Sequence, residues 1–285
     1  MKRAWILLAL AALWPAVGNA GGARGHLQTG DLPTYLRDRG EGIPTSMFGT
    51  YVQKGQLLVY PFVEHYRNAN EEYAPNELGG TEDVDYRGDY EANEQLLFLA
   101  YGISDRLAIE MEGAIMQAEL ERSREDASPL PTEITESGLG DVEGQLRFRW
   151  ARETAGRPEV FSYFETVFPT QNETSLIGTS DWEFKLGTGL TRGFGFGTMT
   201  VRGAFEYNRA EDLIEVGELA VEYLKRLSPN FRVYTGVEGV QDEWEFISEL
   251  QWHVAGNLFF KFNNAFGVTS KAADWAPEMG IMFGL

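Results

Sequence analysis

Apolar and polar residues alternate with a period of two along most of the chain. The alternation is clearest in residues 141–150, where four charged side chains share one phase and apolar or small residues fill the other. It returns in residues 182–190, 199–207, 245–254 and 278–285. A helix does not sort its residues in this way, because its side chains repeat about every 3.6 residues. A strand buried on both faces would not tolerate the charges. Each segment is therefore predicted to be a β-strand with one apolar and one polar face.

Weaker alternation marks further strands, which complete a set of about twelve. Each predicted strand has the roughly 9–11 residues that a tilted strand needs to cross a lipid bilayer. The first of them holds apolar residues in both phases, so its register is the least defined. The additional segments are residues 57–66, 94–102, 107–116, 160–168, 217–225, 231–240 and 258–268.

The connections between these strands alternate between short turns and longer polar loops. Short connections follow the even-numbered strands, for example residues 103–106 and 255–257. Long polar stretches follow the first, third and fifth strands, at residues 67–93, 117–140 and 169–181. Outer-membrane barrels have short periplasmic turns and longer extracellular loops. The pattern predicts an all-β fold, an antiparallel up-and-down transmembrane β-barrel with both termini in the periplasm.

A soluble β-sandwich or lipocalin-like barrel would show the same alternation, with the apolar face turned inward. Three features favour a membrane barrel. The polar faces carry both charge signs and many glycines, which suits a narrow lumen. The chain ends on an alternating apolar strand that resembles the signal read by the barrel-assembly machinery, although Leu285 stands where that signal usually has an aromatic residue. Aromatic residues near the strand ends match interfacial girdles, and they are Trp150, Phe168, Trp182, Tyr207, Tyr223, Trp252 and Phe266.

The first twenty residues differ in composition from the rest of the chain. Two basic residues precede an apolar stretch at residues 4–17, and small residues follow it. This is the layout of a secretory signal peptide, and the stretch is short for the alternative, a membrane-anchoring helix. We expect residues 1–20 to be removed, residues 21–56 to form an N-terminal periplasmic leader or plug, and residues 57–285 to form the barrel. The expected location is the outer membrane of a Gram-negative bacterium, after secretion across the inner membrane.

Composition excludes several classes of function. The chain has no cysteine, which excludes thiol catalysis, disulfide scaffolds and thiolate metal sites. Its formal net charge of −19 argues against nucleic acid as a partner, because nucleic-acid binders present a basic surface. An acidic run between Glu71 and Asp89 could hold calcium, but it lacks the spacing of a calcium-binding loop, so we interpret it as a solvated loop.

Candidate catalytic and metal-binding residues are few. The three histidines, His26, His65 and His253, are far apart in sequence and show no metal-ligand spacing. An outer-membrane hydrolase could use His253, which shares a strand face with Glu245 and Glu249, but no nucleophile stands at strand spacing from it. We therefore interpret His253 as a luminal histidine hydrogen-bonded to neighbouring carboxylates. We expect no catalytic residue, no cofactor and no metal.

The polar strand faces predict the lining of the lumen. Ten acidic and six basic residues lie in this phase together with one histidine. The acidic excess would favour cations if the lumen is open. A closed, salt-bridged core is the alternative, because twelve strands lie between roughly eight in a filled barrel and sixteen in an aqueous porin. The predicted lumen-lining residues are Asp141, Glu143, Arg147, Arg149, Glu165, Glu183, Lys185, Arg202, Glu206, Glu222, Arg232, Glu238, Glu245, Glu249, His253, Lys261 and Glu278.

Four stretches resemble a known group of proteins: GIPTSMFGTY at residues 42–51, LAYGISDRL at 99–107, SGLGDVE at 137–143 and EYLKRLSP at 222–229. They are similar to uncharacterised Gram-negative outer-membrane proteins near the group labelled putative transporter or "MetA-pathway of phenol degradation". The resemblance covers most of the chain from about Gly42 onward. It implies a small outer-membrane barrel, and the label of the group implies passage of aromatic or other hydrophobic compounds. No catalytic residues carry over from it.

Three functions are open on the sequence alone. The first is a passive channel or transporter for small solutes, hydrophobic or aromatic ones included. The second is a closed structural or docking barrel of the cell envelope, and the third is an outer-membrane hydrolase. We expect the first, without enzymatic activity. The expected partners are outer-membrane lipid, the barrel-assembly machinery during biogenesis and a small-molecule solute.

Overall fold

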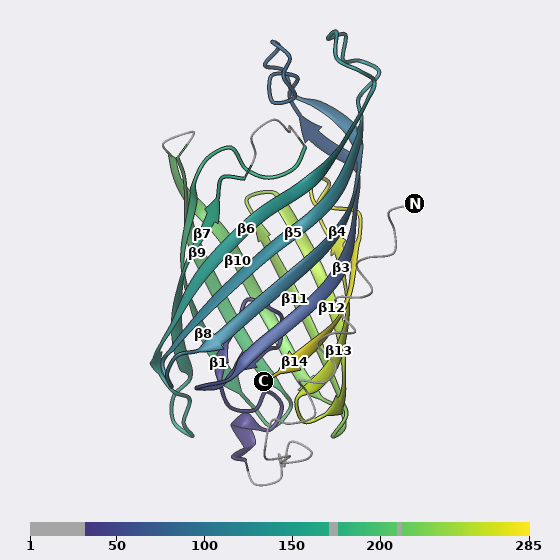
Figure 1. Cartoon of the computed structure of the whole chain (residues 1–285). Coiled ribbons are helices and arrows are strands. Elements are labelled where there is room, and N and C mark those ends of the chain that lie inside the picture. Colours follow the sequence, from purple (N-terminus) through teal and green to yellow (C-terminus); the bar gives the residue numbers. More distant parts are fainter. Residues whose placement is uncertain (1–31, 171–175, 210–212) are drawn as a thin grey trace.

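Twelve antiparallel strands form a closed barrel in the computed structural model, which describes residues 32–170, 176–209 and 213–285 (Figure 1). The strands are β3 (Leu57–Tyr73), β4 (Tyr86–Gly102), β5 (Leu107–Glu121), β6 (Glu133–Ala151), β7 (Glu159–Phe168), β8 (Glu183–Gly193), β9 (Thr198–Asn208), β10 (Leu213–Arg226), β11 (Phe231–Val240), β12 (Glu243–Ala255), β13 (Leu258–Gly267) and β14 (Ala276–Gly284). Each strand pairs with the next, and β14 pairs with β3 to close the ring. This confirms the predicted fold. In the described part of the chain, no helix is long and apolar enough to cross a membrane.

The two ends of the barrel differ in their connections. Short turns such as residues 103–106, 194–197 and 256–257 lie at the end that also holds the C-terminus (Figure 1). Longer loops, residues 74–85 and 268–275 among them, lie at the other end. Since short turns of outer-membrane barrels face the periplasm, we name these the periplasmic and extracellular ends.

Three short elements precede the barrel and lie at its periplasmic end (Figure 1). They are the 3-10 helix η2 (Thr34–Leu36) and the strands β1 (Ile43–Pro44) and β2 (Tyr51–Val52), which pair with each other. Residues 32–56, which contain them, are called the N-terminal segment below.

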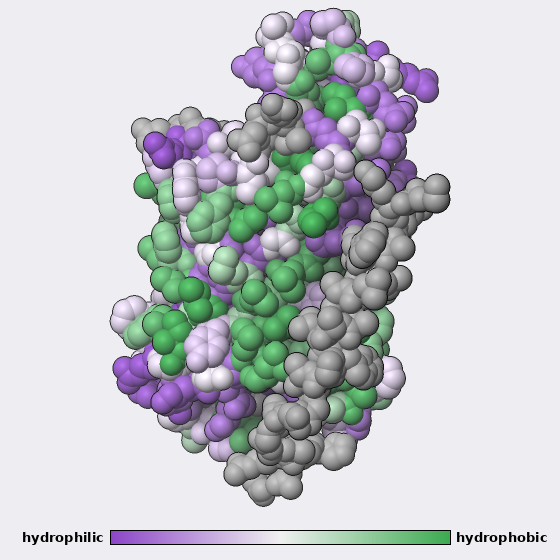
Figure 2. All heavy atoms as spheres, viewed as in Figure 1, coloured by the Kyte–Doolittle hydropathy of each residue, from purple (hydrophilic) through white to green (hydrophobic). Residues whose placement is uncertain are grey.

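The outer face of the barrel is apolar and exposed. One rung of directly paired residues runs through Ile109, Leu146, Phe164, Leu186 and Phe205 on β5 to β9. All five side chains are exposed, Leu186 and Phe205 by about 60%. Figure 2 shows hydrophobic residues gathered around the middle of the barrel, with hydrophilic residues at both ends. A soluble barrel would bury this face and expose the charged one, so the surface is that of a barrel in lipid.

Strands β3 to β6 extend further than the sequence predicts. They continue on the extracellular side as a projecting four-stranded ribbon, with Tyr73 opposite Tyr86 and Glu121 opposite Glu133 at its far end (Figure 1). The predicted loops at residues 67–93 and 117–140 are therefore wrong in extent. The ribbon leaves the bilayer, so it loses the apolar outer face that marks a membrane strand in the sequence, while its backbone ladder continues. An apolar cluster that includes Tyr73, Leu78 and Leu120 stabilises it.

Arginine on the lipid-facing side should destabilise the barrel in proportion to its depth. We expect Leu186→Arg, in the middle of the exposed rung, to lower the free energy of unfolding by about 2–4 kcal/mol. Phe231→Arg, at the periplasmic start of β11, is the control and should cost about 0–1 kcal/mol. Denaturant unfolding of the protein refolded into phospholipid vesicles measures both values. Equal effects at the two positions would contradict the placement of this face in lipid.

Candidate functional site in the barrel lumen

The seventeen residues predicted to line the lumen lie on strand faces turned away from the lipid. None of them is exposed, and about half are buried, among them Arg147, Glu249 and Lys261. Their neighbours in the other phase, such as Leu146 and Leu250, are exposed apolar residues. The part that these side chains take in the passage of a solute stays a prediction.

The N-terminal segment packs against opposite walls of the periplasmic half of the lumen. Ile43 and Val52 are almost completely buried in a cluster with inward-facing residues of β3, β4, β5, β13 and β14. On the other side, the ring of Phe48 stacks on Tyr234 of β11 with centroids 5.0 Å apart. These contacts explain the apolar residues in both phases of residues 57–66, since Leu58, Tyr60 and Phe62 face this segment and alternate with lipid-facing residues.

Hydrogen bonds to wall side chains fix the segment further. The backbone N–H and the hydroxyl of Ser46 both donate to Oε2 of Glu110 on β5, at 2.9 and 2.6 Å. Across the lumen, Nε2 of Gln251 on β12 donates to the carbonyl oxygen of Phe48 at 3.1 Å. The segment therefore adds hydrogen bonds to buried wall groups that also pair within the wall, Glu110 with Arg147 and Gln251 with Glu249. The role of the N-terminal region as a leader or a plug stays a prediction.

Arg39 joins the segment to the periplasmic ends of the strands. Its Nη2 lies 3.2 Å from Oε2 of Glu153 and 3.0 Å from Oε2 of Glu159. All three side chains are at most 2% exposed. Burial raises the pKa of Glu153 above its ordinary value, even though Arg39 favours the ionised carboxylate. The guanidinium also lies 5.1 Å from the ring centroid of Tyr51, and burial raises the pKa of Tyr51 to about 12.

A fully buried ion pair lies beside this segment. Nζ of Lys261 on β13 is 3.0 Å from Oε2 of Glu249 on β12, and both side chains have no exposed surface. The ammonium group also lies 5.1 Å from the ring centroid of Tyr60 and 6.0 Å from that of Phe48. The lumen is therefore filled with packed side chains at this level.

Basic side chains in the middle of the lumen each hold several carboxylates. Arg202 on β9 pairs with Glu218, and at 2.6 Å with both Glu222 and Glu238. Lys185 on β8 holds two further glutamates in the same way. This is the pairing that buried charges require, and here the acidic groups outnumber the basic ones.

Carboxylates face one another without bases in another part of the lumen wall. Glu278, Glu64 and Glu94 are directly opposite on β14, β3 and β4, and Glu112 is opposite Glu143 on β5 and β6. Like charges at directly paired positions destabilise a sheet. Within residues 32–170, 176–209 and 213–285, the last four of this group, Glu64, Glu94, Glu112 and Glu143, have no basic side chain at ion-pair distance.

Two cavities adjoin these carboxylates. One, of about 340 Å³, is lined by Glu94, Glu112 and Glu143 on one side and by apolar residues on another. The second, of about 370 Å³, shares Glu143 and also contains Lys185. This half of the lumen therefore has room for water and for small ions.

Residues 176–182, which lead into β8, fold into the extracellular mouth. Ile177 is only 2% exposed and packs on Ala92 and Ala118 of β4 and β5. The backbone N–H of Thr179 donates to Oδ1 of Asp141 at 2.8 Å. The loop narrows the mouth above the first of the two cavities, because Ile177 also lines that cavity.

His253 does not have the surroundings expected from the sequence. It is buried, and Nε of Arg232 donates to its Nε2 at 2.9 Å. Its ring stacks on Phe259 at 4.6 Å. The predicted hydrogen bonds to carboxylates are therefore wrong. Glu249 is paired with Lys261, and Arg232 of the adjacent strand β11 occupies the hydrogen-bonding position at the imidazole. Within the described ranges, no three His, Asp or Glu side chains are arranged to hold a metal ion.

Sequence reasoning missed several luminal residues. Glu110 and Glu112 alternate with lipid-facing Ile109 and Met111, so the period-two pattern of residues 107–116 contained the signal. Arg39, in contrast, lies in a segment without regular alternation, and no pattern links it to its two distant glutamates.

No family model matches the chain, and no curated protein matches it in sequence. Solved structures resemble it in fold. An outer-membrane channel from Pseudomonas putida F1 has a TM-score of 0.62 at 14% identity, with 86% of this chain and 100% of that chain covered. The translocator domain of the autotransporter NalP from Neisseria meningitidis has a TM-score of 0.53 at 10% identity, with 81% and 89% covered.

This chain is an outer-membrane β-barrel. The closed ring of strands and its exposed apolar belt carry that statement. At these identities the likeness extends to the fold alone, and the grouping with proteins of phenol degradation stays a prediction.

The buried pair of Lys261 and Glu249 can be tested by a double-mutant cycle. We expect Lys261→Met to lower the free energy of unfolding by about 3–5 kcal/mol, because it leaves a buried carboxylate unpaired. Adding Glu249→Leu should recover most of that loss. The control is Arg67→Gln, which breaks an exposed pair with Asp89 and should change stability by less than about 1 kcal/mol. Denaturant unfolding measures the cycle, and an additive double variant would contradict coupling between the two charges.

Proposed function

We propose that the protein is a passive outer-membrane channel for small solutes, closed in this conformation by residues 32–56, which we call the plug. The observation that carries this proposal is the division of the lumen. The extracellular part holds cavities lined by carboxylates, whereas the periplasmic part is filled by a segment attached through side chains. A barrel with a purely structural role has no need of a hydrated, charged upper lumen above a separable seal.

The preferred solutes are cations. Glu64, Glu94, Glu112 and Glu143 lie at the cavities or beside them and have no paired base in the part of the chain that the structure describes, so the potential there is negative. The charged wall gives less support to aromatic or hydrophobic solutes, which the resemblance to the phenol-degradation group implies. The apolar belt is the surface that contacts outer-membrane lipid, and the terminal strand β14 is the segment that the barrel-assembly machinery would read.

A closed structural or docking barrel is the second candidate. The same plug supports this alternative. The side chains of Lys261 and Gln251 beside it have no exposed surface, so the lumen is filled at that level. The hydrolase alternative has no comparable support, since the contacts of His253 are with Arg232 and Phe259.

Replacing luminal carboxylates should reduce cation preference. We expect Glu112→Gln and Glu143→Gln each to lower the ratio of potassium to chloride permeability by about twofold, because each removes a charge that attracts cations. Glu91→Gln is the control, since Glu91 is exposed on the projecting ribbon and should leave the ratio unchanged. The measurement is the reversal potential of the protein in planar bilayers under a potassium chloride gradient. Absence of any conductance at all salts and voltages would contradict the channel, and chloride preference would contradict the cation selectivity.

Weakening the attachment of the plug should open the channel more often. We expect Arg39→Gln to raise the open-to-closed ratio about fivefold for each kcal/mol that it removes from the seated plug. Arg67→Gln, whose ion pair lies outside the lumen, should leave the ratio unchanged. Single-channel recordings give the ratio directly. An unchanged ratio in Arg39→Gln would show that opening does not involve the plug.

A further inference from the structure

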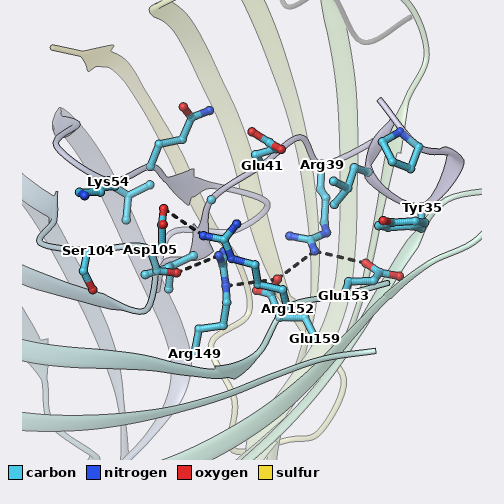
Figure 3. A pocket seen from close by; sticks show the side chains of 16 residues that line it. Tyr35, Arg39, Glu41, Lys54, Ser104, Asp105, Arg149, Arg152, Glu153 and Glu159 are labelled. Carbon is cyan, nitrogen blue, oxygen red and sulfur yellow. Dashed lines mark hydrogen bonds and ion pairs between the residues drawn. The ribbon is translucent and has the colours of Figure 1, made fainter. Parts of the chain in front are cut away.

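A cavity of about 430 Å³ lies between the plug and the periplasmic ends of the strands (Figure 3). The plug contributes Arg39 to its lining, and the wall contributes Arg149 at the end of β6 and Arg152 in the following turn. Figure 3 shows these three guanidinium groups converging on the same space. The cavity is separate from the acidic cavities above the plug, which share no lining residue with it.

Arg39 has hydrogen-bond donors that the protein leaves unused. Its two carboxylate partners, Glu153 and Glu159, both bind Nη2, whereas Nε and Nη1 have no hydrogen-bond partner among the described residues. The side chain is only 1% exposed, so bulk water does not replace the missing partners. In Figure 3 one terminal nitrogen of Arg39 points across the cavity toward Arg149 and Arg152. Buried donors without partners are energetically costly, so a hydrogen-bond acceptor bound beside Arg39 would be stabilising.

The carboxylates of the lining do not complete it, because three of the four are already engaged and the fourth, Glu41, is exposed and accepts no hydrogen bond from Arg39. Asp105 lies 3.0 Å from Nη2 of Arg152. Glu159 lies between Arg39 and Arg149, at 3.0 and 3.4 Å. The unpartnered donors belong to a planar guanidinium group, whose geometry suits the oxygens of a carboxylate or phosphate group.

We propose that this cavity binds a small soluble anion that carries a carboxylate or phosphate group, held by Arg39 of the plug together with Arg149 and Arg152 of the wall. The anion accepts hydrogen bonds from the unused donors of Arg39 and leaves the pairs with Glu153 and Glu159 in place. It therefore bridges the plug to the wall.

This site exists only while the plug is seated, because ten of its sixteen lining residues belong to the plug. A ligand that binds one state of an equilibrium stabilises that state. The anion therefore holds the channel shut, a consequence that rests on the proposed function. At ten times its dissociation constant, it should lower the open-to-closed ratio about tenfold.

Calorimetric titration of the refolded, full-length protein tests the site without relying on conductance. Inorganic phosphate and succinate are the two probes, each titrated in chloride buffer of matched ionic strength. We expect saturable binding of at least one probe at one site per chain, and the comparison shows which anionic group the cavity prefers. Arg39→Gln should weaken binding by at least about tenfold and Arg152→Gln by severalfold. Arg152→Gln is the variant that keeps the plug seated, since its side chain is 56% exposed and its partner Asp105 lies in a turn.

Lys225→Gln is the matched control. Lys225 pairs with Asp38 of the plug at 3.3 Å but does not line the cavity, so this variant loses a plug contact and should keep the affinity of the wild type. Absence of saturable binding of both probes to the wild type would overturn the proposal, and so would unchanged affinity in Arg152→Gln. Phosphate on the periplasmic side of a planar bilayer should also lower the open probability. Calorimetric binding by a protein that never conducts would refute the channel and leave the anion site standing.

Discussion

Backbone hydrogen bonding in a medium without water is the constraint on which this structure depends. In lipid, every backbone N–H and C=O must find its partner within the protein, and for strands this requires a closed ring. The ladder between β14 and β3 supplies the closure that leaves no free edge. Once the ring is closed, side chains alternate strictly between lipid and lumen, apart from local shifts of register such as the one between Val216 and Leu219 on β10. The lipid demands apolar residues on one face, so the charges of an acidic chain are confined to the lumen and the two ends.

Confining charges to a narrow lumen creates a second requirement, because a buried charge must be paired or hydrated. The two halves of the lumen meet it differently. In the periplasmic half, the N-terminal segment excludes water and provides partners, as Ser46 does for Glu110. In the other half, cavities are lined by Glu94, Glu112 and Glu143, which have no paired base among the described residues. The inner wall changes character accordingly, from apolar residues such as Tyr60 and Phe98, which pack with the segment, to glutamates beyond it.

The sequence predicts features that depend on neighbouring residues better than features that depend on residues far apart in the chain. Alternation is local, and it located twelve strands and the inward phase of residues such as Arg147 and Glu249. The extent of β3 to β6 was not predictable in this way, since their projecting parts contact water on faces that are lipid-covered elsewhere in the barrel. Contacts between side chains across the lumen produce no pattern in the local sequence. Arg39 meets Glu153 and Glu159 more than a hundred positions away, and His253 meets Arg232 where neighbouring carboxylates were expected. One sequence feature did indicate internal packing, the apolar residues in both phases of residues 57–66. The sequence did not show which segment packs against them.

The N-terminal segment is attached to the barrel mainly through side chains, and this determines which part of the molecule can move. Its hairpin of β1 and β2 pairs with itself, and its β-bridge to the barrel in the described residues is that of Lys54 with Gly102, close to the start of β3. Its other contacts with the wall are side-chain ion pairs, side-chain hydrogen bonds and apolar packing, as seen at Arg39, Ser46 and Phe48. Such contacts can be broken individually, with water replacing the lost partners. The barrel has no equivalent freedom, because a ladder bond broken in lipid has no substitute. In the proposed channel, a change between closed and open states is therefore a movement of the segment within a ring that stays intact.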